Sequence, residues 1–87
     1  MRLSLNKTQY RAVNDLRGLP DGAHMLVMCS EITATGGVLE GPDEAFRELV
    51  AFIGEDLAEG MLSATATRAL WALCVKIDPH SAEWLGE

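Results

Sequence analysis

The sequence has little cysteine and no long apolar run. Two cysteines among 87 residues exclude a disulfide framework and a cysteine-rich zinc site. No apolar stretch approaches the roughly 18 residues of a membrane-spanning helix. Residues 1–7 lack the apolar stretch and cleavage site of a signal peptide. We therefore expect a cytoplasmic protein that forms a single small globular domain over residues 1–87, since a chain of this length buries about 60% of its unfolded surface in one core.

The motifs of common enzymes are also missing. Neither His24 nor His80 stands in a metal or catalytic motif, and the run Thr35-Gly36-Gly37 is too short to cradle a phosphate. Cys29 is followed closely by an acid, and Cys74 lies within an apolar pattern, so we expect two buried hydrophobic residues rather than nucleophiles. The sequence thus predicts no catalytic residue, no metal ligand and no cofactor.

Basic residues are scarce and unevenly placed. Seven Lys and Arg face 13 Asp and Glu, which gives a net charge of −6. Residues 21–63 carry nine acids against the single base Arg47, whereas residues 1–20 carry a net positive charge. Because phosphate contacts need clustered Lys and Arg, this balance argues against a nucleic-acid partner and favours a basic protein partner.

Capping signals predict the first two helices. Asn6 is a good N-cap with Gln9 at the capping-box position, and Gly18 can end a helix over residues 7–17. Pro42 and the acids that follow it begin a second helix over residues 42–59, which Gly60 ends.

The remaining helices lie toward the C-terminus. Ser63 as N-cap and the pair Asp78-Pro79 delimit a long helix over residues 64–77. A short helix over residues 81–85 is expected to follow it. The apolar residues of the long helix nearly encircle it, which favours a buried position.

Residues 23–40 fit two structures. We favour a hairpin, with a strand over residues 24–29, a turn near residues 35–37 and a return over residues 38–40. Residues 2–5 alternate in polarity and could add a third strand. The resulting fold class is α+β: an N-terminal helix, a short hairpin, two long helices and a short C-terminal helix. The alternative is an all-α bundle of four to five helices in which residues 22–34 are helical, because Met25, Met28, Cys29 and Ile32 repeat at helical spacing.

The helix over residues 42–59 is acidic on one side. At 100° per residue four carboxylates share an arc of about 60°, directly opposite the apolar face. Phe52 borders this arc and could anchor an interface. We call the four carboxylates the acidic ridge: Glu44, Glu48, Glu55 and Glu59.

A second unusual feature is Trp71 with Val75, which lie outside the main apolar arc of the helix over residues 64–77. Either this helix is covered on two sides, or a second copy of the chain covers it. A homo-oligomer seam would then consist of Trp71, Val75 and Trp84.

Three functions follow from these patterns. The first is a non-enzymatic acidic protein-binding module whose ridge docks a basic partner, which is inhibitor- or immunity-like by charge analogy only. The second is a small homo-oligomeric structural or accessory subunit. The third, which the absence of motifs disfavours, is a ligand-binding or enzymatic domain with a site between subunits.

Overall fold

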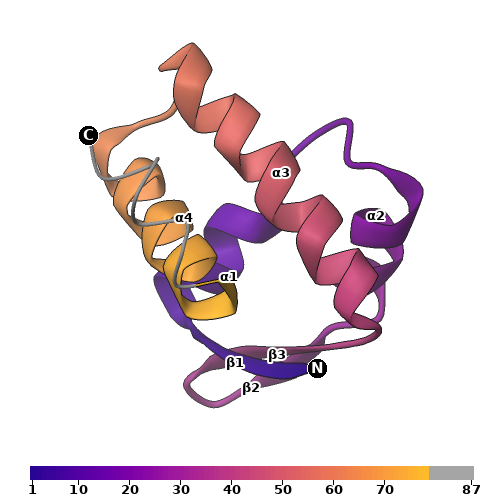
Figure 1. Ribbon diagram of the computed structural model, residues 1–87. Coiled ribbons are helices and arrows are strands. Elements are labelled where there is room, and N and C mark those ends of the chain that lie inside the picture. Colours follow the sequence, from indigo (N-terminus) through magenta and orange to yellow (C-terminus); the bar gives the residue numbers. More distant parts are fainter. Residues whose placement is uncertain (79–87) are drawn as a thin grey trace.

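The computed structural model describes residues 1–78, and the expected helix over residues 81–85, with His80 and Trp84, lies outside them. Four helices and three strands follow one another along this part of the chain (Figure 1). In chain order they are β1 (Arg2–Asn6), α1 (Lys7–Asn14), α2 (Asp21–Met28), β2 (Glu31–Thr33), β3 (Gly36–Glu40), α3 (Asp43–Glu59) and α4 (Ala64–Ile77). The predicted α+β class is confirmed.

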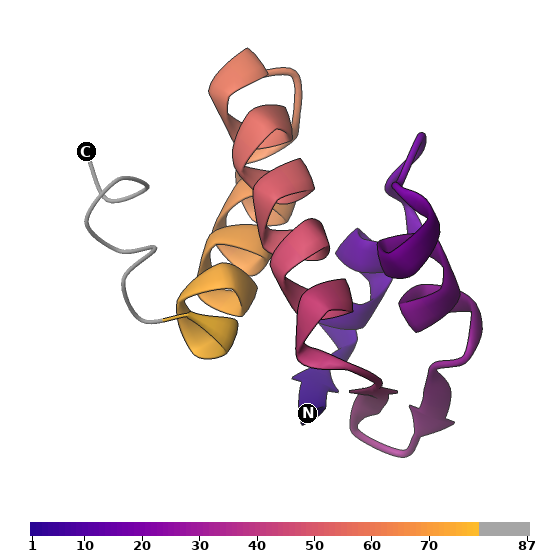
Figure 2. The ribbon, with the colours of Figure 1, turned by 45° about the vertical axis from the view of Figure 1, so that its right-hand side comes forward.

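The three strands form an antiparallel sheet in the order β1-β3-β2. β1 pairs with β3 from Arg2 opposite Glu40 to Asn6 opposite Gly36, which confirms that the N-terminal residues supply a third strand. The helices lie on one side of this sheet, as the two ribbon views show (Figures 1 and 2).

Residues 23–40 combine the two expected structures. The expected strand over residues 24–29 is wrong, since these residues belong to α2 and the segment that follows it. Ala, Met and Leu favour a helix, and this segment contains Val27 as its single β-branched residue. A hairpin does form, but β2 is its first strand and its turn is Ala34-Thr35 rather than residues 35–37. The all-α alternative is wrong as well, because residues 31–40 are strands and a turn.

α1 and α4 begin where their caps predict, whereas α3 begins at Asp43, one residue after the predicted Pro42. The Asn6 side chain accepts a hydrogen bond from the Gln9 backbone at 2.8 Å, and the Gln9 side chain accepts one from the Asn6 backbone at 3.1 Å. Ser63 caps α4, and Gly60 ends α3 in the left-handed conformation. α1 ends at Asn14, earlier than the predicted residue 17.

The core lies between the sheet and α1, α3 and α4. Its largest fully buried side chains include Phe46, Leu49 and Ile53 of α3, together with Leu70 and Leu73 of α4. These residues belong to the apolar sides predicted for the helices over residues 42–59 and 64–77. The face of α3 that holds the acidic ridge therefore points away from the core.

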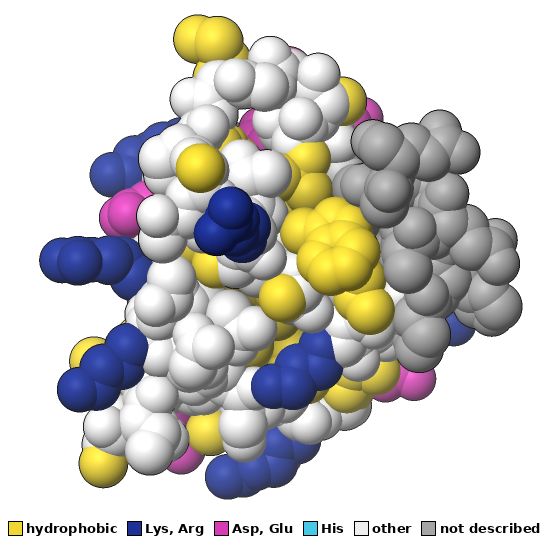
Figure 3. All heavy atoms as spheres, turned by 90° about the vertical axis from the view of Figure 1, so that its left-hand side faces the viewer, with side chains coloured by type: hydrophobic (Ala, Val, Ile, Leu, Met, Phe, Trp, Pro, Cys, Tyr) yellow, Lys and Arg dark blue, Asp and Glu magenta, His cyan; other side chains and the backbone are white. Residues whose placement is uncertain are grey.

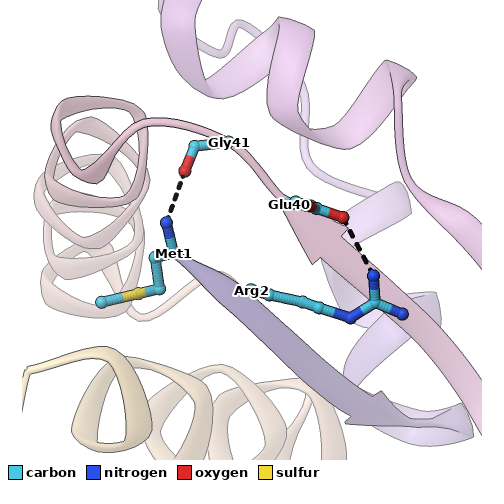
Figure 4. A network of polar contacts seen from close by, with 4 residues as sticks. All are labelled: Met1, Arg2, Glu40 and Gly41. Carbon is cyan, nitrogen blue, oxygen red and sulfur yellow. Dashed lines mark hydrogen bonds and ion pairs between the residues drawn. The ribbon is translucent and has the colours of Figure 1, made fainter.

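Polar contacts hold the edge strand β1 at its N-terminal end and in its middle. Arg2 bonds Glu40 at 3.0 Å, and the N-terminal ammonium donates to the Gly41 carbonyl at 2.8 Å (Figure 4). The Lys76 ammonium of α4 donates to the Ser4 carbonyl at 2.8 Å. Because an unpaired strand edge invites pairing with another chain, this lysine protects part of β1.

Candidate protein-binding surface

The acidic ridge runs along the outer side of α3. The side chains of Glu44, Glu48, Glu55 and Glu59 are all exposed. In residues 1–78 no ridge carboxylate forms an ion pair or a side-chain hydrogen bond. The ion pairs of this part of the chain instead include Met1 with Asp43 and Arg2 with Glu40. The ridge is thus a line of carboxylates without cationic partners in the described residues.

The ridge is an unfavourable arrangement for an isolated helix. Glu44 and Glu48 are four residues apart, as are Glu55 and Glu59, and like charges at this spacing cost a few tenths of a kcal/mol per pair. Glu59 also lies in the last turn, where the helix dipole disfavours a negative charge and where α3 carries no base. Helix stability therefore does not explain the ridge.

Phe52 is half-buried and packs against the core. It borders the ridge by its position on α3, but much of its surface already contacts this chain. Its contribution to an interface is limited to the part that stays exposed.

Two residues of the candidate oligomer seam, Trp71 and Val75, lie in the described part of the chain. Trp71 keeps 36% of its surface exposed, and Val75 is half-buried, so the described residues do not cover α4 on both sides. Trp84 lies outside the described residues. Figure 3 shows this side of the molecule, where several Lys and Arg side chains lie next to an apolar cluster. The charge of this face differs in sign from that of the ridge.

The two cysteines differ from each other. Cys74 is buried as expected, and burial raises the pKa of its thiol to about 12. Cys29 is exposed, so the expectation that it is a buried hydrophobic residue is wrong. Cys29 is the C-cap residue that follows α2, beyond Ala23 and Leu26, the residues that the helix buries.

Charged side chains line one hollow in the described part of the chain. A hollow of about 420 Å³ lies between α3 and the C-terminal end of α4, with Asp43, Arg47 and Asp78 among its lining residues. No group of three or more His, Cys, Asp and Glu side chains is close enough to hold a metal ion in the described part of the chain. No helix there has the length and apolar character that crossing a membrane requires.

Comparison of the chain with protein-family models, with curated proteins and with solved structures finds no match. Function is therefore inferred from the surface of the protein itself.

The outer side of α2 was not among the candidate binding surfaces predicted from the sequence. Met25 and Met28 are 59% and 69% exposed, although both were expected in a strand. The helical spacing of Met25, Met28 and Cys29 was the signal, and it was visible in the sequence. What the spacing did not reveal is that the core would take the opposite side of the helix.

Proposed function

We propose that this protein is a non-enzymatic binding module that docks a basic protein partner on the acidic ridge. The observation that carries the proposal is the line of four exposed carboxylates without a cation in the described residues. A carboxylate line of this kind steers a cationic surface toward it and speeds the encounter. The expected partner presents Lys or Arg side chains over the length of α3.

The variant Glu48→Gln with Glu55→Gln tests the ridge. It removes two negative charges without reversing any, and it should leave the free energy of unfolding unchanged or slightly higher, because each substitution relieves one pair of like charges. Association with the partner captured by the wild-type protein should slow by about tenfold at low ionic strength and lose much of its salt dependence.

The matched control is Thr8→Lys with Thr67→Lys, which changes the net charge by the same amount on the exposed surfaces of α1 and α4. Association rates of the three proteins are measured at two ionic strengths by surface plasmon resonance. Equal rates for the Gln variant and the wild type would contradict the proposal. Equal slowing in the Gln and Lys variants would show that net charge, rather than the ridge, matters.

A homo-oligomeric role is the second candidate. The observation that favours it is the exposed part of Trp71 beside the half-buried Val75 on α4. Large aromatic side chains are frequent anchors of interfaces. This candidate uses the face opposite in charge to the ridge, so the two functions are compatible.

A further inference from the structure

The helix α2 has apolar side chains on two sides, and the core covers one of them. Ala23 and Leu26 are buried, whereas Met25 and Met28 lie largely in solvent. A helix at the surface of a globular protein normally presents polar residues outward. We call the outward side, formed by Met25, Met28 and Cys29, the methionine face. In residues 1–78 nothing covers it.

A groove runs beside the methionine face. It has a volume of about 270 Å³. Its walls include Met25 of α2, the following Cys29, and Gly41, Pro42 and Ala45 where the chain enters α3. Cavities of about 150 Å³ already admit benzene. The groove therefore admits one branched aliphatic or aromatic side chain.

Acidic residues lie beside this apolar surface, either in contact with α2 or close to it along the chain. Asp21 begins α2, Glu31 begins β2, and both are exposed. Glu48 of the ridge lies directly against Gly22, so closely that a side chain at residue 22 would meet its carboxylate. Glu44 precedes the groove residue Ala45.

Arg2 lies beside the groove but already forms an ion pair. Glu40 lines the groove, and Arg2 is bound to its carboxylate at 3.0 Å. An anionic lipid surface or a nucleic acid would meet repulsion from the neighbouring acids. A second copy docked face to face would set the same acids against each other. The charges thus favour a cationic occupant.

We propose that the methionine face binds a cationic amphipathic helix of a partner protein. One apolar side chain of that helix enters the groove, its neighbours at i+3, i+4 and i+7 lie on Met25 and Met28, and its Lys and Arg side chains face the neighbouring acids. α2 is about 12 Å long, which matches about two turns of a helix. Unbranched methionine adapts to apolar surfaces of different shape. This inference rests on the proposed function, because Glu44 and Glu48 belong to both surfaces.

The probe is a synthetic amphipathic peptide of Leu and Lys, with its leucines on one helical side. Its control is an isomer of the same composition in which the leucines are scattered. The protein carries [¹³C-methyl]methionine, so its methyl NMR signals report on separate places. The signals of Met25 and Met28 should shift and saturate with the amphipathic peptide, whereas Met61, 85% exposed at the other end of α3, should not.

The variant Met25→Gln with Met28→Gln keeps the helix and its charge but removes the apolar contact. It should bind the amphipathic peptide at least about tenfold more weakly, since apolar contact area is lost from two side chains. Met61→Gln is the matched control and should bind as the wild type does. Circular dichroism and the melting temperature confirm that each variant is folded.

Several results would overturn the inference. Equal affinity for the two peptides, or undiminished binding by the Met25 and Met28 variant, would exclude the methionine face. If either result were found and Glu48→Gln with Glu55→Gln still weakened peptide binding, the proposed function of the ridge would stand without the methionine face. Failure of both peptides to bind would count against both proposals. If the methyl signals of Met25 and Met28 shifted with protein concentration alone, the occupant would be a second copy of the chain. If they shifted on deletion of residues 79–87, the occupant would be the chain's own C-terminal segment.

Discussion

Two cysteines of the same chain have opposite surroundings. Cys74 is fully buried in α4 among core residues, while Cys29 follows α2 on an exposed side. Burial penalises the charged thiolate, which is why the pKa of Cys74 rises from 9.0 to about 12. The same residue type is thus a core hydrophobic residue at one position and an accessible thiol at the other.

The raised pKa of Cys74 predicts a loss of stability in alkali. Above pH 9 the unfolded chain releases the thiol proton while the folded chain keeps it, so the free energy of unfolding should fall by up to about 1.4 kcal/mol per pH unit toward pH 12. Urea denaturation of the wild type and of Cys74→Ala, repeated from neutral pH upward, measures this slope. The variant should be less stable at neutral pH but should lack the contribution of the thiol to the slope. Identical slopes would show that Cys74 ionises normally.

At the scale of elements, two glycines allow β3 to lie close to its neighbours. Gly36 has a φ of 152°, and a side chain there would meet the backbone of Leu5 and Asn6 in β1. A side chain at Gly37 would meet the ring of Tyr10 in α1. The Tyr10 hydroxyl is in turn hydrogen-bonded to Ser30 Oγ at 2.8 Å. This contact connects α1 to the segment between α2 and the hairpin.

The close approach of Gly37 and Tyr10 predicts a coupled effect. Gly37→Ala should destabilise the protein by about 1–3 kcal/mol, because its methyl group displaces the ring. In the Tyr10→Ala background the same substitution should cost much less, since the ring is gone. A double-mutant cycle by urea denaturation measures the coupling. Additive effects would mean that the ring does not limit the residue at position 37.

The misassigned strand over residues 24–29 has a physical explanation. A short apolar run fits a buried strand and a helix equally well, so its period does not decide between them. Pro20 and Asp21 provide a helix start, and Ala, Met and Leu then favour the helix. The residues that do form the hairpin, Glu31–Thr33 and Gly36–Glu40, are the β-branched and glycine-rich part of the segment.

At the scale of the whole molecule, charges of opposite sign gather on different faces. The acidic ridge lies along α3, while Lys and Arg predominate over the face in Figure 3. Arg2 and Lys76 contact Glu40 and the Ser4 carbonyl rather than a carboxylate of the ridge. The fold therefore keeps the ridge unneutralised within the described residues.

Self-association through Trp71 and Val75 would be visible in solution. A seam there predicts that the mass measured by analytical ultracentrifugation rises from one chain to two with concentration. Trp71→Asp should restore the mass of one chain, because a buried unpaired charge costs several kcal/mol in an interface. Thr35→Asp, exposed in the turn between β2 and β3 rather than on α4, should not change the equilibrium. A constant mass of one chain in the wild type would contradict the seam.

Sequence alone determined the features that depend on neighbours along the chain. The capping box of Asn6 and Gln9, the start of α4 after Ser63 and the end of α3 at Gly60 are local hydrogen bonds and backbone preferences. The place of the ridge opposite the apolar face of α3 follows from helical geometry in the same way. Each of these features can be predicted from the sequence because the interacting groups lie within a few residues of each other.

Tertiary structure decided what is covered and what is not. The pairing of β1 with β3, the burial of Cys74 and the exposure of Cys29, Met25 and Met28 depend on residues distant in sequence. Periodicity shows that α2 has apolar residues on two sides, but it does not show which side meets α3. Burial is a property of the assembled chain, and the surface that we propose for a partner is defined by the side that the core left open.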